Sequence, residues 1–278
     1  MSQQGERVFL KLGGSLITDK KREQTPRLDV IRRLAEEIRQ ATDARPDLKL
    51  LIGHGSGSYG HFVGQRYRTR EGIVNDESWR GYAETGAVAA RLNRQVTDAL
   101  LEAGLPVLSV QPSASALCHD GELLHLEVRP IVTALEKGLI PLVYGDVALD
   151  EVRGCTIAST EEVFGYLAKL LRPQRIVLAG IVDGVYDRDP LRDLAARPIA
   201  DISPANYAKV EQRLGGSHGV DVTGGMSSKV REMAALARRV PGLVVHLVTG
   251  EEPARLRQVL LDPQAAGGTR IWWPAESG

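Results

Sequence analysis

Cysteine is scarce in this sequence: Cys118 and Cys155 are the only two among 278 residues, and they show no metal-ligand spacing. This usage fits a reducing compartment. Long apolar runs are also missing, since none approaches the roughly 20 residues that cross a bilayer. The polar start at Met1–Arg7 has no apolar segment behind a basic stretch, so it does not look like a secretory signal. We therefore expect a cytoplasmic protein that has no membrane partner.

An excess of charge of either sign is absent as well. Lys+Arg and Asp+Glu both number 35, so the formal net charge is zero. A nucleic-acid partner usually leaves a basic footprint, and neither this balance nor any basic run provides one. Any anionic ligand must therefore be held by individually placed cations. The length and the 43% apolar content fit either one large domain or two close lobes.

Compact apolar runs flanked by glycine or proline alternate with longer amphipathic segments. Continuous apolar runs of this length are typical of strands that are buried on both faces of a parallel sheet. The predicted strands are Val8–Leu12, Leu48–Gly53, Pro106–Val110, Ile140–Tyr144, Arg175–Ala179 and Leu243–Val248, with Ile271–Trp273 as an edge strand. The predicted helices are Asp29–Thr42, Glu77–Ala103, Ser159–Leu171, Ser227–Val240 and Pro253–Leu261. The alternation predicts a three-layer αβα sandwich around a mainly parallel central sheet.

The first of three glycine-rich junctions directly follows the first predicted strand. Gly13 and Gly14 let the backbone approach a ligand closely and point its N–H groups at a phosphate. Lys11 and Lys20 flank this turn and can add positive charge. A tight turn with two surface lysines is the plainer interpretation of these residues.

The second junction, His54–His61, follows the second predicted strand. Its glycines and serines at positions 55–58 suggest an anion-binding turn that opens a short helix from about Tyr59. His61 would then lie near the helix start, facing the anion, whereas we expect His54 to be a structural residue.

The third junction, Asp221–Met226, precedes a predicted helix that carries Lys229. Gly224 and Gly225 at a helix N-terminus, with a lysine one turn later, form a second plausible phosphate site. Upstream, Asp183–Pro190 reads as a polar turn by itself.

In this order and at these separations, the motifs resemble those of the amino acid kinase superfamily from about Val8 to Thr249. K-x-G-G-S, D-G-V-Y-D-R-D-P and T-G-G-M-x-x-K are characteristic of that superfamily. The histidine that ends G-x-G-x-x-G-H at Gly55–His61 is similar to that of isopentenyl phosphate kinases, and it also occurs in fosfomycin-phosphorylating kinases. The chain departs from the pattern at Ser56, where glycine is more common, and at Ile181, where a small hydroxyl or acidic residue is common.

The resemblance implies ATP-dependent phosphorylation of isopentenyl phosphate to isopentenyl diphosphate, by a homodimer, with Mg²⁺ accompanying ATP. It implies one amino acid kinase domain over residues 1–278, with an acceptor-binding lobe (about 1–150) and a nucleotide-binding lobe (about 151–278). The implied catalytic residues are Lys11, Lys20 and His61. The implied ATP contacts are Lys11, Gly13, Gly14, Ser15, Gly57, Asp183, Tyr186, Gly225 and Lys229. The implied acceptor contacts are Gly55, Ser56, Gly60, His61, Gly145 and Asp146, and no protein side chain is expected to ligate a metal.

This chemistry fits the residue types. An acceptor phosphate carries about −1.5 to −2 charges near neutral pH, so it needs no general base. Repulsion between two phosphates is the difficulty, and lysines, backbone N–H groups and a histidine relieve it. A kinase of another small acid, such as fosfomycin or an amino-acid carboxylate, is an alternative. A nucleotide-binding sensor is another, although the presence of Lys11, Lys20 and Lys229 together favours an enzyme.

The helix Glu77–Ala103 is rich in small residues, for which two interpretations are open. Side chains of this size, such as Gly86 and Ala87, leave room either for the acceptor's hydrocarbon tail or for close helix packing. The sequence does not decide between them.

Overall fold

A central sheet of eight strands organises the fold. The computed structural model describes residues 5–188, 190, 193, 195–215, 225–264 and 267–274. The strand order is β12-β14-β13-β9-β1-β2-β6-β3. These strands are β1 (Arg7–Leu12), β2 (Lys49–His54), β3 (Val107–Ser109), β6 (Ile140–Tyr144), β9 (Arg175–Gly180), β12 (Asp201–Ile202), β13 (Val244–Thr249) and β14 (Thr269–Trp272). Every neighbouring pair is parallel except β13 and β14, so the predicted mainly parallel sheet is confirmed.

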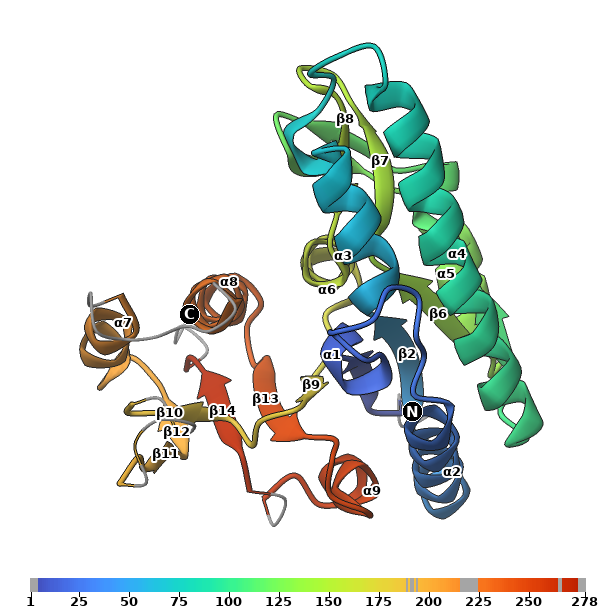
Figure 1. The fold of residues 1–278 in the computed structure, drawn as a ribbon. Helices are drawn as coiled ribbons and strands as arrows, with labels where there is room; N and C mark the ends of the chain where they lie inside the picture. The colour runs from blue at the N-terminus through green and yellow to red at the C-terminus, as the bar shows by residue number, and fades with distance from the viewer. Residues whose placement is uncertain are drawn as a thin grey trace.

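Helices cover both faces of this sheet, which gives the predicted three layers (Figure 1). On β1, Val8 and Leu10 belong to one apolar core and Phe9 to the other, which is why apolar residues follow one another directly in this strand. The first core contains residues of α1 (Gly14–Ile17), α2 (Leu28–Ala44), α3 (Gly57–Arg66), α4 (Ser78–Glu102) and α9 (Arg255–Leu261). The second contains residues of α5 (Arg129–Glu136), α6 (Thr160–Leu171), α7 (Tyr207–Gly215) and α8 (Gly225–Arg239). Among the described residues, no helix combines the length and apolar character needed to cross a membrane.

The sequence did not predict two smaller sheets. One has four strands in the order β5-β4-β7-β8, namely β4 (Leu117–His119), β5 (Glu122–His125), β7 (Asp146–Asp150) and β8 (Gly154–Ala158). The other pairs β10 (Val185–Tyr186) with β11 (Pro198–Ile199). Short 3₁₀ turns lie at Thr69–Glu71 (η1) and Pro112–Ala114 (η2). The antiparallel β7–β8 pair, with Asp150 opposite Gly154, forms a hairpin just before Ser159.

Two predicted element ends can be compared in detail. The predicted helix start at Ser159 is confirmed by a capping box, in which the Ser159 hydroxyl accepts from the Glu162 amide at 3.1 Å while the Glu162 carboxylate accepts from the Ser159 amide. The prediction that Ile271–Trp273 forms an edge strand was wrong. β12 pairs with β14 on its outer side, so Ile271 is fully buried.

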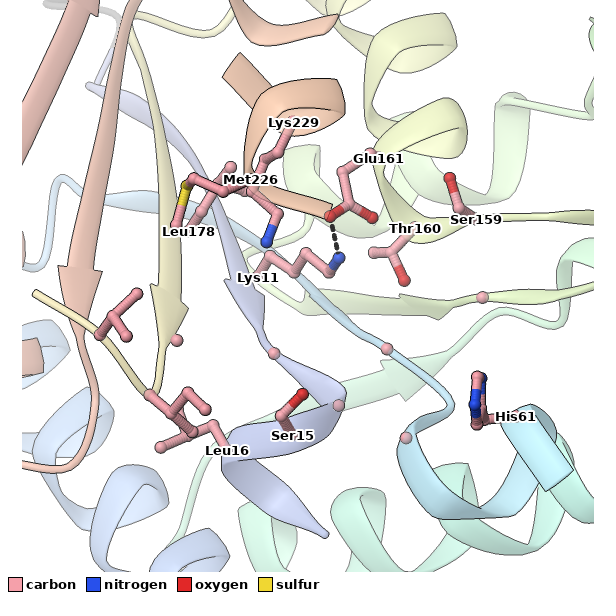
Figure 2. Close-up of a pocket in the computed structure, with 18 of the residues that line it drawn as sticks. Lys11, Ser15, Leu16, His61, Ser159, Thr160, Glu161, Leu178, Met226 and Lys229 are labelled. Atoms are coloured by element: carbon pink, nitrogen blue, oxygen red, sulfur yellow. Dashed lines mark ion pairs between the residues drawn. The ribbon is translucent and has the colours of Figure 1, made fainter. Parts of the chain in front are cut away.

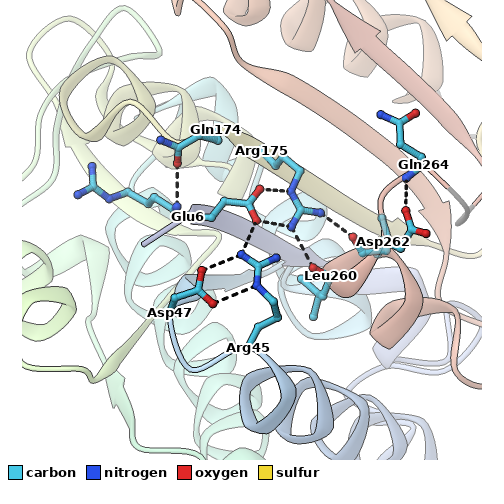
Figure 3. Close-up of polar contacts among 10 residues, drawn as sticks. Glu6, Arg45, Asp47, Gln174, Arg175, Leu260, Asp262 and Gln264 are labelled. Atoms are coloured by element: carbon cyan, nitrogen blue, oxygen red, sulfur yellow. Dashed lines mark hydrogen bonds and ion pairs between the residues drawn. The ribbon is translucent and has the colours of Figure 1, made fainter. Parts of the chain in front are cut away.

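A network of charged side chains ties together the amino ends of the central strands (Figure 3). The Arg175 guanidinium donates to Glu6 Oε2 at 2.9 Å and to the carbonyl oxygens of Val259 and Leu260 at 2.6 and 3.0 Å. Arg45 also binds Glu6, at 3.3 Å. The last turn of α9 is therefore anchored to the start of β1 and β9, at the end of the sheet opposite the carboxyl ends of these strands.

Candidate active site

A cavity of about 1840 Å³ opens where the parallel strands of the main sheet end. Gly13 follows β1, Gly55 follows β2 and Gly145 follows β6, and all three line it. Because the carboxyl ends of parallel strands share one edge of a sheet, loops that are far apart in the sequence meet here. The predicted site residues that line the cavity are Lys11, Gly13, Gly14, Ser15, Lys20, Gly55, Ser56, Gly57, Gly60, His61, Gly145, Tyr186 and Lys229.

The first glycine loop is shaped by close backbone contacts. The Gly13 amide donates to Ala179 O at 2.8 Å, and a Cβ on Gly13 would lie 2.8 Å from that same oxygen. A Cβ on Gly14 would lie 2.5 Å from the amide nitrogen of Gly57. Side chains are excluded at these distances, so the first and second glycine loops touch backbone to backbone.

The second glycine loop opens α3 two residues earlier than predicted. Gly57, the first residue of α3, has φ +50°, a conformation that glycine adopts without strain. A Cβ on Gly60 would lie 2.4 Å from Ser56 Oγ, so the serine hydroxyl occupies the space beside Gly60. The helix N-terminus, with its outward N–H groups, is suited to an anion.

The two histidines of this loop have different environments. His54 is fully buried, stacks on Tyr144, accepts from Asn93 Nδ2 at 3.1 Å and donates to Gly55 O at 3.1 Å. Burial lowers the pKa of His54 to about 4, so its imidazole is neutral at physiological pH. His61, in contrast, is exposed on α3 and lines the cavity (Figure 2). The structural interpretation of His54 is confirmed, and His61 is the histidine that is accessible to a ligand.

Glu161 is a site residue that the sequence analysis missed. Its carboxylate forms an ion pair with Lys11 Nζ inside the cavity, and Lys229 of α8 lies close by (Figure 2). Burial by itself raises the pKa of Glu161, but the positive charges of Lys11 and Lys229 outweigh this effect and hold the pKa below its ordinary value. One carboxylate thus faces two of the three predicted lysines and can orient both.

In the sequence, Glu161 is marked only by its place in the first turn of a predicted helix. Carboxylates are common there because they interact favourably with the helix dipole, so this position does not by itself indicate a site residue at Glu161. Its neighbour Glu162 pairs with Arg70 at 2.9 Å, and the Thr160 hydroxyl donates to His54 O at 2.6 Å. The first turn of α6 therefore connects the lysine cluster to the second glycine loop.

Two predicted carboxylates do not line the cavity. Asp146 is buried and accepts from the amides of Ser113 and Val147 at 3.1 and 2.9 Å, and burial raises its pKa. Asp183 accepts from the Thr249 amide at 3.2 Å and lies 3.7 Å from Arg255. In this arrangement both carboxylates have protein partners, and their predicted contacts with acceptor and nucleotide stay predictions.

The third glycine motif is only partly within the described residues. Asp221–Gly224 lie outside them, whereas Gly225 is the first residue of α8. Lys229, one turn into this helix, lines the cavity together with Met226 and Ser227. The expected lysine one turn after the glycine pair is therefore brought to the same cavity as Lys11.

Two small residues of α4, Gly81 and Gly86, lie in close packing contacts. A Cβ on Gly81 would lie 2.3 Å from the Tyr67 side chain, and one on Gly86 would lie 3.0 Å from Val147. None of the small residues of α4 lines the cavity. Packing therefore explains Gly81 and Gly86, whereas Ala87 is exposed and a hydrocarbon-binding surface at that position stays a prediction.

The side chains also bear on metal binding. Within the residues that the structure describes, no group of three or more His, Cys, Asp or Glu side chains is placed to hold a metal ion. The carboxylate nearest the lysines, Glu161, already has Lys11 as its partner. The cavity is therefore better suited to polyanionic phosphates than to a bare cation.

Comparison with known proteins places this geometry in a family. The model of the amino acid kinase family matches residues 6–247. The isopentenyl phosphate kinase of Methanothermobacter thermautotrophicus is 37% identical over 272 residues, which are 95% of this chain and 98% of that protein. The isopentenyl phosphate kinase of Methanocaldococcus jannaschii is 33% identical over 231 residues, covering 80% and 85%. An X-ray structure of isopentenyl phosphate kinase superposes with a TM-score of 0.81 at 34% identity, covering 95% of this chain and 99% of that one. The chain therefore belongs to the amino acid kinase family, and within it to the isopentenyl phosphate kinases.

Proposed function

We propose that this protein transfers the γ-phosphoryl group of ATP to isopentenyl phosphate and forms isopentenyl diphosphate. The observation that carries the proposal is that four cationic or imidazole side chains line one cavity: Lys11, Lys20 and His61 beside the two touching glycine loops, and Lys229 on α8. The solved structures to which the chain is similar include a substrate complex and a product complex of isopentenyl phosphate kinase.

The acceptor phosphate attacks the γ-phosphorus of ATP, and ADP leaves. Since the attacking oxygen is already anionic, catalysis consists of aligning two phosphates and neutralising their charge. Lys11 and Lys229 neutralise the donor phosphates, and Glu161 orients the two ammonium groups. Lys20, exposed at the cavity wall, stabilises the transferring group.

His61 is assigned to the acceptor phosphate. It lies on α3, behind the Gly55–Gly57 turn, and is accessible from the cavity. A charge-assisted hydrogen bond from its ring to the phosphate would distinguish a phosphate-bearing acceptor from a carboxylate. Gly145 lines the same cavity and supplies backbone to the acceptor side, with Asp146 packed behind it.

The proposal extends to Mg²⁺ and to the working state of the enzyme. Mg²⁺ would enter with ATP, coordinated mainly by phosphate oxygens and water. A cytoplasmic location agrees with Cys118 and Cys155, which are both free and buried. A homodimer is expected from the resemblance to the superfamily.

A side-by-side assay tests the proposal. The purified protein is given MgATP with isopentenyl phosphate, fosfomycin or glutamate, and the phosphorylated products are measured by mass spectrometry. We expect turnover with isopentenyl phosphate at a kcat/KM far above the other two. Preferred turnover of fosfomycin or glutamate, or none with any acceptor, would reject the assignment.

A further inference from the structure

We propose that Thr18, which no part of the reaction described above uses, is a positioning residue that sets the Lys20 loop against the start of α3. The inference rests on the proposed function, since the spacing it concerns is that between the transferring phosphoryl group and the acceptor. Thr18 does not line the cavity, so its role is to hold other groups.

The Thr18 hydroxyl bridges the two glycine loops. Its side chain is almost completely buried, with 1% of the residue exposed. Oγ1 donates to Gly14 O at 2.7 Å in the first loop and accepts from the Ser58 amide at 2.9 Å in the first turn of α3. One hydroxyl thus satisfies a carbonyl and an amide that belong to segments 44 residues apart, counted from Gly14 to Ser58.

The same hydroxyl explains why position 57 is glycine. A Cβ on Gly57 would lie 2.2 Å from Thr18 Oγ1 and 2.6 Å from Gly14 O. The space at which a side chain would stand is therefore filled by the threonine. Removing the hydroxyl should loosen Gly57 as well as Ser58, and both belong to the first turn of α3, between the proposed acceptor contacts Ser56 and Gly60.

The loop that carries Lys20 is attached to the same point of α3. It closes on itself where the Asp19 amide donates to Thr25 O at 2.9 Å. The Gln24 amide donates to Ser58 O at 3.3 Å, and the Thr25 amide donates to Ser58 Oγ at 3.3 Å. Thr18 stands at the base of this loop, so the clasp formed by Thr18 and Ser58 fixes Lys20 relative to the helix that carries His61.

The clasp matters because the reaction depends on alignment. Phosphoryl transfer is catalysed by positioning and charge stabilisation, and a misplacement of about 1 Å can reduce the rate about 100-fold. Two bonds to a buried hydroxyl are lost together in Thr18→Val, which keeps the shape, and both can be remade in Thr18→Ser. The two variants separate the hydroxyl's role from the packing of the side chain.

The kinetic test compares wild type, Thr18→Val and Thr18→Ser with isopentenyl phosphate and MgATP. For Thr18→Val we expect kcat to fall by about 10- to 100-fold. The dissociation constant for a non-hydrolysable ATP analogue, measured by calorimetry, should stay within about threefold, since Lys11 and Lys229 are unchanged. Thr18→Ser should recover most of the lost kcat.

Thr97→Val is the matched control. Thr97 is also buried, and its hydroxyl makes the same kind of bond, to the carbonyl of Asn93 four residues earlier, at 2.8 Å. It lies on α4 and does not line the cavity. We expect Thr97→Val to lower the melting temperature while kcat stays at the wild-type level.

Hydrogen exchange measured by mass spectrometry tests the clasp without any turnover. Thr18→Val should speed exchange in peptides that cover residues 17–26 and 54–62, whereas Thr18→Ser and Thr97→Val should leave these peptides protected. Unchanged exchange together with wild-type kcat in Thr18→Val would overturn the proposal, as would a kcat loss that Thr18→Ser does not restore. If the wild-type protein phosphorylated only another acceptor, the proposed substrate would be wrong. The role of Thr18 would then be tested by the same hydrogen-exchange comparison and by kcat with that acceptor.

Discussion

Replacing Glu161 with glutamine tests the charge arrangement around Lys11. The change keeps the side chain's size but removes the negative partner of an ion pair whose side chains are only 11% (Lys11) and 12% (Glu161) exposed. Two unit charges 4 Å apart attract by about 4 kcal/mol at an effective dielectric constant of about 20. Desolvation of both groups offsets much of this attraction. We therefore expect Glu161→Gln to lower the unfolding free energy by roughly 1–3 kcal/mol, as measured by urea denaturation.

The same variant should separate catalysis from ATP binding. Loss of the carboxylate leaves Lys11 and Lys229 less well oriented, so kcat should fall about 10- to 100-fold. The KM for ATP should not rise, because removing a negative charge beside the phosphates weakens no attraction. A saturating non-hydrolysable ATP analogue should narrow the stability difference from wild type, since the phosphates give Lys11 a new anionic partner.

The pH dependence has a definite sign. A carboxylate whose pKa is lowered by folding stabilises the protein above its unfolded pKa, and that stability is lost as the pH falls through the folded pKa. The pKa of Glu161 lies below its ordinary value of 4.5. The stability difference between wild type and Glu161→Gln should therefore be complete above about pH 5 and shrink as the pH falls below about 4.5.

Glu84→Gln is the control for this experiment. Glu84 pairs with Arg80 on the surface, where the arginine side chain is 72% exposed, so its loss should leave the unfolding free energy nearly unchanged. Wild-type stability and wild-type kcat in Glu161→Gln would refute the view that this carboxylate organises the lysines.

Three further predictions concern Lys20, His61 and His246. Lys20→Ala should lower kcat roughly 100- to 1,000-fold with little change in KM for either substrate, because its contact forms mainly in the transition state; an unchanged kcat with a higher KM would make Lys20 a binding residue only. His61→Ala should lower kcat/KM for isopentenyl phosphate roughly 10- to 150-fold, and His61→Gln should lose less because it keeps one donor; a wild-type value in His61→Ala would contradict the assignment. Burial lowers the pKa of His246 from 6.5 to about 4. Between these two pH values the histidine is protonated in the unfolded chain but neutral in the folded protein, so the unfolding free energy should fall by up to about 3 kcal/mol as the pH drops from 6.5 to 4. His246→Phe should flatten that decline in urea denaturation between pH 7 and 4, and an unchanged slope would show that His246 does not cause it.

The main sheet could be predicted from the sequence because its strands are buried on both faces. A run such as Val8–Leu10 must be apolar at every position to serve two cores, and no surface helix has that pattern. The four-stranded sheet gave no such signal. β4 and β5 are three and four residues long, and polar residues such as His119 and Glu122 interrupt any alternation.

The candidate site could be predicted where the chemistry requires a particular residue type. Glycine is needed at 13 and 14 because the backbones touch, and at 57 because the Thr18 hydroxyl and Gly14 O fill the space of a Cβ; a pattern of glycines is visible in a sequence. Glu161 and Thr18 were missed because their roles come from partners far along the chain, Lys11 for one and Ser58 for the other. Only the folded topology brings these partners together.

The central place of β1 has a consequence for how the chain folds. β1 precedes the other strands of the central sheet in the sequence, yet Phe9 pairs with Leu51 on one side and with Ile176 on the other. Glu6 and Arg175 form an ion pair at the amino ends of β1 and β9, and these two residues are 169 positions apart in the sequence. Until β9 emerges, one edge of an apolar strand exposes unpaired N–H and C=O groups, which are a template for pairing with other chains.

Closing contacts of such long range is slow, because the chain loses entropy before the contacts stabilise it. We therefore expect slow refolding that competes with aggregation at high protein concentration. A fragment that ends before β9 should associate with its own copies rather than fold alone. The interior of this protein is thus completed late in synthesis, by strands from its second half.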